Sequence, residues 1–229
     1  MALIPAQAQR NQYEIHFTRP DGSEVWGRVN STLLAETTGG PSLVLTQIED
    51  ITMLRTMQAR FAYAATHDRL TGLPNRALVL DRLAAALTGS HHGEGRVAVL
   101  FCDLDHFKEV NDTLGHAAGD QLLTEVGRRL ELTAREPDAV GRFGGDEFVM
   151  IGFPVPTPAE AISLAARVIQ TVKRPVKLCG ETFSPSISIG VALSVADDNA
   201  DSVLANADRA LYAAKAAGRG RWRLARSAW

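Results

Sequence analysis

The chain has 229 residues, 45% of them apolar, which is long enough for one well-packed domain and a smaller appended segment. Its 24 Lys and Arg residues against 26 Asp and Glu residues give a net charge of -2, which argues against a surface that binds a nucleic-acid backbone. No apolar stretch approaches the roughly 18 residues of a membrane span, and the segment MALIPAQAQR lacks the features of a signal peptide. We therefore expect a cytoplasmic protein with no nucleic-acid partner and no membrane segment in this chain.

Both cysteines, Cys102 and Cys179, stand among apolar residues, with neither CxxC spacing nor nearby metal-ligating side chains. This pattern is typical of free thiols in a reducing compartment. We expect both thiols to be buried and to have no metal or redox role.

Residues 1–51 are predicted to form three strands. Apolar and polar residues alternate in QYEIHFT and in EVWGRVNSTLL, and PSLVLTQIED supplies a third extended run. The linkers RPDGS and TTGGP are typical of tight turns, so we expect an antiparallel meander. This pattern, which ends in IEDIT, resembles the C-terminal half of a PAS sensor domain. The helices that normally close the ligand pocket of such a domain are missing here, so we interpret the meander as a structural remnant.

Residues 52–66 contain neither Gly nor Pro, which favours a helix. Leu54, Met57, Phe61 and Ala64 recur at spacings of three, four and three, so one face of this helix is apolar. Such a stripe packs on its own domain more often than on a partner. Because this helix links two modules, we predict a coiled-coil stalk between two protomers.

Helical and extended patterns alternate from residue 67 to residue 226, over about the length of one domain. The segment DRLTGLPNRALVLDRLAAALTGS predicts a turn followed by a helix, whose expected apolar face consists of Leu78, Leu80, Leu83 and Leu87. The next run, RVAVLFCDLDHF, is almost wholly apolar, as expected for a central strand covered on both faces.

Acidic residues follow the buried strands of this region. The central strand ends at Asp103 and Asp105, and burying an uncompensated carboxylate is costly. The runs DAVGRF and EFVMIGF, joined through two glycines, predict a hairpin with Asp146 and Glu147 near its tip. If this hairpin pairs beside the central strand, three carboxylates converge and require a cation, for which oxygen ligands select Mg²⁺ or Mn²⁺ over zinc. For an isolated GGDE a solvated turn would be the preferred interpretation, and the remaining motifs decide against it.

Five motifs together resemble the GGDEF family of diguanylate cyclases, in the order and spacing of that family. They are DRLTGLPNR, DLDHFKEVNDTLGHAAGD, GRFGGDEF, SISIGVA and ADRALYAAKAAGRGR. The resemblance covers residues 66–224 and implies an α+β, ferredoxin-like domain with a central antiparallel sheet, akin to the palm of polymerases and to nucleotidyl cyclases. It also implies that two GTP molecules are joined into cyclic di-GMP with release of two pyrophosphates.

The resemblance also implies a metal site. Its ligands are the carboxylates of Asp103 and Asp146 and the main-chain carbonyl of Leu104, and two Mg²⁺ or Mn²⁺ ions per GTP site are expected. The catalytic role of Glu147 stays open between metal binding and proton acceptance. The metal would help to deprotonate the ribose 3′-hydroxyl and neutralise charge on the triphosphate.

Further residues are implied to bind the substrate. The groups expected on the phosphates are the backbone amides of His106 and Phe107 and the side chains of Lys108, Lys215 and Arg219. Of these, Lys108 is implied to be catalytic, because its charge stabilises the departing pyrophosphate. Many family members have Asn where this chain has Gly220, so the turn after Arg219 can differ here.

Three positions match those that recognise the guanosine. Asn111 and Asp120 would meet the donors and acceptors of guanine, and His116 matches a third position in the substrate site. Asn111 and Asp120 could alternatively be helix caps beside a loop, and the two roles can coexist.

The segment REPD, Arg135 to Asp138, matches the RxxD site at which the family binds its product as an inhibitor. Five residues separate it from the GG pair. An arginine fork suits a phosphate and a guanine edge, and Asp138 can accept from base N–H groups. Arg167 is a candidate for a second contact with the product. Without the other motifs, an Arg and an Asp at a turn would be a surface pair of little consequence.

We therefore predict a diguanylate cyclase that acts as a homodimer, because two 3′-hydroxyls must each attack the other nucleotide's α-phosphate. The alternative is a catalytically silent GGDEF module that serves as a receptor for GTP or cyclic di-GMP or as a dimerisation unit. Intact Asp103, Lys108, Asp146 and Glu147 argue against it. The predicted organisation is a partial PAS domain over 1–51, a linker helix over 52–66 and a GGDEF domain over 67–226.

Overall fold

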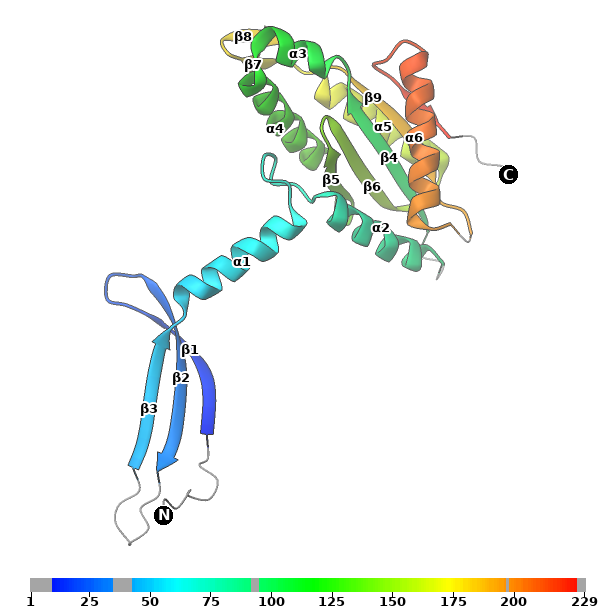
Figure 1. Cartoon of the computed structure of the whole chain (residues 1–229). Coiled ribbons are helices and arrows are strands. Elements are labelled where there is room, and N and C mark those ends of the chain that lie inside the picture. Colours follow the sequence, from blue (N-terminus) through cyan, green and yellow to red (C-terminus); the bar gives the residue numbers. More distant parts are fainter. Residues whose placement is uncertain (1–9, 35–42, 92–94, 197, 226–229) are drawn as a thin grey trace. The chain divides into compact units, whose positions relative to one another are not determined.

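A computed structural model describes residues 10–34, 43–91, 95–196 and 198–225 (Figure 1). The chain divides into two compact units, Met1–Ala65 and Thr66–Trp229, and each is described by itself. Among the described residues, no helix is long and apolar enough to cross a membrane. The cytoplasmic location stays a prediction.

The first unit contains an antiparallel sheet in the order β1-β2-β3, followed by a helix. The elements are β1 (Arg10–Thr18), β2 (Glu24–Leu34), β3 (Leu43–Asp50) and α1 (Thr52–Thr66). The predicted meander and linker helix are confirmed, and the turn at RPDGS is closed by a bond from the Arg19 amide to the Ser23 carbonyl. The turn predicted at TTGGP, residues 37–41, lies outside the described residues. The PAS origin of the sheet stays a prediction.

The polar face of this sheet holds the start of α1. Glu14 accepts hydrogen bonds from Arg28 and Arg55, and the Arg55 guanidinium lies 4.2 Å from the ring centre of Trp26. Asp50 accepts from the first amide of the helix, that of Thr52, at 3.0 Å. These contacts fix the direction in which α1 leaves the sheet.

The predicted apolar stripe of α1 is solvent-exposed in the single chain. The exposed fractions are 45% for Leu54, 51% for Met57 and 73% for Phe61, and α1 has no buried residue. These large apolar side chains recur at helical spacing, and no other part of the first unit covers them. Such an exposed row favours contact with a partner.

The second unit is built on a five-stranded sheet in the order β10-β9-β4-β6-β5. Its first half comprises α2 (Arg76–His91), β4 (Arg96–Leu104), α3 (Phe107–Leu114), α4 (His116–Thr133), β5 (Ala139–Gly144) and β6 (Glu147–Val155). Its second half comprises α5 (Pro158–Val172), β7 (Val176–Leu178), β8 (Glu181–Phe183), β9 (Ile187–Leu193), α6 (Ala200–Ala216) and β10 (Trp222–Leu224). The α+β fold is confirmed, with one refinement: β10 runs parallel to β9, so an otherwise antiparallel sheet is mixed.

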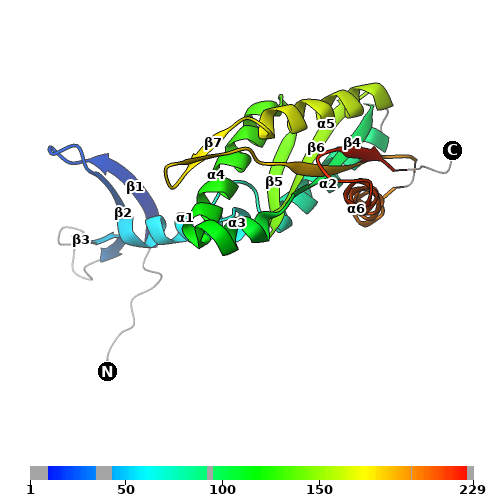
Figure 2. The ribbon, with the colours of Figure 1, turned by 90° about the horizontal axis from the view of Figure 1, so that it is seen from above.

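The central strand β4 is buried on both faces, as its apolar sequence predicts. Ala98, Leu100 and Cys102 pack with α4 and α5, whereas the alternate residues Val97, Val99 and Phe101 pack with α2 and α6. Figures 1 and 2 show the sheet between these two helical layers. Odd-numbered positions of β4 therefore face α6, and Asp103 continues this row.

Two expectations about burial need correction. The buried face of α2 consists of Val79, Leu83 and Leu87, whereas Leu78 and Leu80 are only half-buried, because the spacing of four starts one residue later than expected. Cys102 is buried as predicted, but Cys179 is exposed. It occupies the tight turn between β7 and β8 in a left-handed conformation, with φ of 49°, which places its side chain at a hairpin tip.

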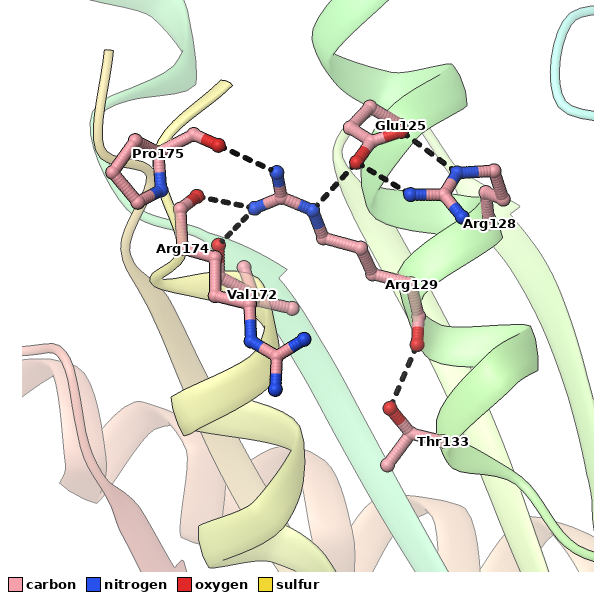
Figure 3. Close-up of polar contacts among 7 residues, drawn as sticks. All are labelled: Glu125, Arg128, Arg129, Thr133, Val172, Arg174 and Pro175. Carbon is pink, nitrogen blue, oxygen red and sulfur yellow. Dashed lines mark hydrogen bonds and ion pairs between the residues drawn. The ribbon is translucent and has the colours of Figure 1, made fainter. Parts of the chain in front are cut away.

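A buried arginine joins the two helices on one face of the sheet (Figure 3). The side chain of Arg129 in α4 is 8% exposed and pairs with Glu125 at 2.7 Å. Its two terminal nitrogens donate to the carbonyls of Val172, the last residue of α5, and of Arg174 and Pro175 just after it. Hydrogen bonds from Arg128, and next from Arg129, lower the pKa of Glu125 to about 2 against the opposing effect of burial. The cluster fixes α4, which carries His116 and Asp120, against α5.

Candidate active site

The GGDEF stretch forms the hairpin between β5 and β6, and β6 pairs with β4. Its turn consists of Gly145 and Asp146, with Gly145 in the left-handed region at φ of 44°. The antiparallel register sets Glu147 directly opposite Asp103. The Leu104 amide donates to the Asp146 carbonyl at 3.2 Å, so the end of β4 and the hairpin tip are held together.

Asp103 has a cationic partner in this structure, namely Lys215 near the end of α6. The distance from Lys215 Nζ to Asp103 Oδ2 is 2.7 Å, and the exposed fractions of the two side chains are 34% and 10%. Burial raises the pKa of Asp103, the Lys215 ammonium opposes this shift, and the charges of Asp146 and Asp105 add to it. This nearly buried carboxylate thus already binds a positive charge.

A glycine in β9 allows α6 to approach the sheet closely enough for this contact. A Cβ at Gly190 would lie 1.9 Å from the Ala207 carbonyl oxygen and 2.3 Å from the Leu211 nitrogen, so the helix backbone packs directly on the strand. Ala207, Leu211 and Lys215 are four residues apart and share one helix face. The glycine of SISIGVA therefore positions Lys215 over the end of β4.

The acidic side chains at this edge of the sheet interact electrostatically but do not form a complete set of metal ligands. Burial raises the pKa of Glu147, and the negative charges of Asp103, Asp146 and Asp208 raise it further. In the part of the chain that the structure describes, no three Asp, Glu, His or Cys side chains are grouped to hold a metal ion by themselves. The predicted convergence of three carboxylates is therefore looser than a preformed site. It still fits Mg²⁺, which commonly uses one or two carboxylates and completes its shell with water and substrate phosphates.

Asp105, the second acidic residue after β4, is held entirely by the protein. It accepts from the hydroxyls of Ser186 and Ser188 at 2.6 and 2.7 Å and from the Gly220 amide at 3.0 Å. Gly220 has φ of 58°, a left-handed conformation that Gly and Asn both tolerate, so the departure from the usual Asn leaves the turn possible. Asp105 thereby anchors the loop that carries Arg219.

The expected phosphate-binding groups lie at two helix ends. His106 precedes α3 with φ of 60°, and Phe107 begins the helix, where backbone N–H groups lack intrahelical acceptors and suit an anion. Lys108 is exposed on the first turn of α3. Arg219 is exposed just beyond the end of α6.

The expected guanine-binding residues lie on the α3–α4 corner. Asn111 is inside α3, and a Cβ at Gly119 would lie 1.9 Å from its Oδ1, so the two helices meet at this side chain. His116 and Asp120 are exposed on α4. The residue that caps the N-terminus of α4 is Gly115, so the alternative of Asn111 and Asp120 as caps is wrong.

Sequence reasoning missed an ion pair that holds the hairpin tip. Arg142 donates to the Gly145 carbonyl at 2.9 and 2.7 Å and to the Asp68 carboxylate at 3.0 and 3.2 Å. Burial alone would raise the pKa of Asp68, but hydrogen bonds from Thr71 and Arg142 lower it on balance. Asp68 belongs to DRLTGLPNR and Arg142 to GRFGGDEF, so the ion pair connects two motifs that are far apart in the sequence.

The three residues of the expected product site line one cavity of about 100 Å³. Arg135 is exposed, and its Nε lies 3.8 Å from Asp138 Oδ1. Asp138 has a 1% exposed side chain and accepts from the backbone amides of Arg135 and Phe153, so it shapes the turn that presents Arg135. Arg167 donates to the Thr133 carbonyl at 3.1 Å from the other wall.

Comparisons with known proteins give matches to the part of the chain that forms the second unit. Residues 65–221 match the family described as "Diguanylate cyclase, GGDEF domain". The chain is 43% identical over 174 residues to the diguanylate cyclase TpbB of Pseudomonas aeruginosa, which covers 75% of this chain and 40% of that protein. The chain thus matches less than half the length of this curated relative.

Solved structures of similar proteins extend the comparison. The GGDEF domain of TpbB from Pseudomonas aeruginosa is similar with a TM-score of 0.68 and 44% identity, covering 70% of this chain and 94% of that one. The structure of the coiled coil and GGDEF domain of DgcB from Caulobacter crescentus, in complex with c-di-GMP, is similar with a TM-score of 0.69 and 31% identity. The match covers 76% of this chain and 93% of that one.

Proposed function

Because the chain belongs to the GGDEF family of diguanylate cyclases, we propose that it joins two GTP molecules into cyclic di-GMP and releases two pyrophosphates. The observation that carries this proposal is the acidic sheet edge where Asp103 and Glu147 face each other and Asp103 binds a cationic side chain. Such an edge beside the N-terminus of α3 suits a metal-bound triphosphate.

The metal would be Mg²⁺ or Mn²⁺, and two-metal sites are common in reactions of this class. When bound, it supplies charge neutralisation on the triphosphate and a lower pKa for the attacking ribose hydroxyl. Asp103, Asp146 and the Leu104 carbonyl would hold it. Glu147, whose pKa is raised by burial and by its acidic neighbours, would be a further ligand or the proton acceptor.

The remaining residues would bind and orient GTP. We assign the phosphates to Lys108, Lys215, Arg219 and the backbone amides of His106 and Phe107, and the guanosine to Asn111, His116 and Asp120. The Asp105 carboxylate, which accepts a hydrogen bond from the Gly220 amide, holds the Arg219 loop in place before substrate arrives. Hydrogen bonds from Arg142 do the same for the hairpin tip. Such preorganisation reduces the cost of orienting the reacting groups.

We further propose that the active unit is a homodimer in which each protomer presents one GTP. The reaction requires two GTP molecules placed so that the 3′-hydroxyl of each attacks the α-phosphate of the other. The exposed apolar stripe of α1 offers a surface on which two chains can pair. The similar DgcB structure, which contains a coiled coil and a GGDEF domain, supports this assignment.

A pyrophosphate-release assay with GTP and Mg²⁺ tests the proposed function. We expect release that depends on both reagents and stops when the metal is chelated. Binding of GTP by calorimetry without any release would instead favour the catalytically silent receptor module.

The stalk assignment predicts the behaviour of a charged variant of α1. Replacing Leu54 and Phe61 with Glu should lower activity per protomer and make it depend steeply on protein concentration, because free encounter replaces tethering. Replacing exposed Thr56 and Ala59 with Glu is the matched control, since it adds the same charge on the side of α1 away from the stripe. A wild type that sediments as an active monomer at catalytic concentration would contradict the stalk.

Product inhibition is proposed for the cavity that Arg135, Asp138 and Arg167 line. Progress curves of the wild type should flatten long before GTP is consumed, because bound cyclic di-GMP holds the two GTP sites apart. Arg135→Ala should restore steady turnover with little change in the initial rate, since the cavity is separate from the acidic edge. Identical curves for both proteins, or no binding of cyclic di-GMP to the wild type, would contradict the inhibitory role.

A further inference from the structure

The ion pair between Lys215 and Asp103 places a cation on a carboxylate that is also a proposed metal ligand. The ammonium lies 2.7 Å from Asp103 Oδ2, and the carboxylate is only 10% exposed. Ionised carboxylates in such surroundings are costly without a counter-charge. Lys215 supplies this counter-charge in the chain as it stands, without nucleotide.

We propose that Lys215 is the resting counter-ion of Asp103 and that it leaves the carboxylate only when a nucleoside triphosphate arrives, so that nucleotide is required for tight metal binding. The inference rests on the proposed function, which supplies the substrate and the metal. It goes further by assigning Lys215 a role before substrate binds, in addition to its role on the phosphates.

Electrostatics make the two cations competitors for one carboxylate. An ammonium and a divalent ion sharing Asp103 would be a few ångströms apart and would repel each other strongly in a partly buried site. The other acidic residues do not compensate, because no three of them within the described residues form a metal-binding group. In the absence of nucleotide, the metal therefore competes against Lys215 for its main ligand.

The surroundings of Lys215 allow the exchange. The backbone of α6 packs directly on Gly190, where a Cβ would clash with it, so the helix stays in place. The exchange therefore involves only the side chain of Lys215. Its side chain is 34% exposed, and a lysine stem has several freely rotating bonds, so the ammonium can turn outward. Triphosphate oxygens then give the ammonium a new acceptor, and Asp103 is freed.

Manganese titration of the protein without nucleotide, followed by electron paramagnetic resonance, tests the proposal. Lys215→Met removes the ammonium and keeps an unbranched stem of similar length, so it should tighten Mn²⁺ binding by about tenfold or more. Lys108→Met is the matched control: it removes one positive charge from the same site, but from a lysine with no ion pair to Asp103, so binding should change far less. Adding Asp103→Asn to Lys215→Met should abolish the gain.

Equal Mn²⁺ affinities for the wild type and Lys215→Met, or equal gains for both lysine variants, would overturn the proposal. Because Lys215→Met leaves Asp103 without its partner, wild-type protein provides a second measurement that needs no variant. The ¹⁵N-detected ammonium signal of Lys215 should persist with Mg²⁺ alone and change only with Mg²⁺ plus a non-hydrolysable GTP analogue. A change with Mg²⁺ alone would contradict it. These readouts do not use turnover, so failure here leaves the synthase assignment standing, and a failed synthase assay leaves the metal result interpretable.

Discussion

Asp146→Asn is expected to abolish cyclic di-GMP synthesis, lowering turnover by about 10³-fold or more, because the variant loses the charge of a proposed metal ligand. The fold should survive. Asp146 is held at the hairpin tip through its backbone, whose carbonyl accepts from the Leu104 amide, and asparagine keeps this contact. Turnover by chromatography and thermal unfolding by circular dichroism measure the two effects separately.

Asp81→Asn is the matched control for this variant. It makes the same change of charge on an exposed residue of α2, away from the acidic edge, and should leave turnover unchanged. Near-normal turnover of Asp146→Asn in the presence of Mg²⁺ would show that the metal assignment is wrong.

Arg142→Met is expected to lower kcat by about 10²-fold, because loss of the side chain frees the hairpin tip that carries Asp146, and small misplacements of catalytic groups have effects of this size. Arg142 is the residue that ties the Gly145 carbonyl to Asp68. It is a positioning residue, and the groups proposed to bind GTP lie on α3, on α4 and at the end of α6, so GTP affinity should change little. Stability should fall as well, since Asp68 loses a partner.

Arg142→Lys separates charge from geometry. A single ammonium cannot reproduce a planar fork that donates to Gly145 and Asp68 together, so lysine should restore little of the lost kcat. Unchanged kcat in both Arg142 variants, or a defect confined to GTP affinity, would contradict the positioning role.

Much of the second unit could be predicted from the sequence because its strands and helices have strong local patterns. The apolar run of β4 and the glycine-linked strands of the hairpin were sufficient to expect that Asp103, Asp146 and Glu147 lie at one edge. The buried face of α2 differs from the predicted one at its first turn. Leu78, Val79 and Leu80 are all apolar, so the sequence alone does not show that Val79 is the buried one. The parallel strand β10 has three residues, too few for any periodicity to indicate a direction.

The ion pairs of the site could not be predicted, because they depend on close approach between distant segments. Lys215 reaches Asp103 only because Gly190 admits the backbone of α6. Arg142 reaches Asp68 because Gly141 allows the Pro74 carbonyl to accept from the Arg142 amide at 2.9 Å, and a Cβ at Gly141 would lie 2.6 Å from that carbonyl oxygen. The sequence does show Gly190 and Gly141 in two of the motifs, which indicates close backbone contacts there. Which segments approach these glycines is known only from the fold.

The nucleotide product formed from GTP is the most direct test of the proposed activity. Purified chain should be incubated with GTP and Mg²⁺, and the products separated and identified by mass spectrometry, with pyrophosphate counted in parallel. We expect cyclic di-GMP together with two pyrophosphates for each molecule formed, and no product when the metal is chelated. Recovery of unchanged GTP across a range of protein concentrations, or hydrolysis to GDP or GMP alone, would contradict the assignment as a diguanylate cyclase.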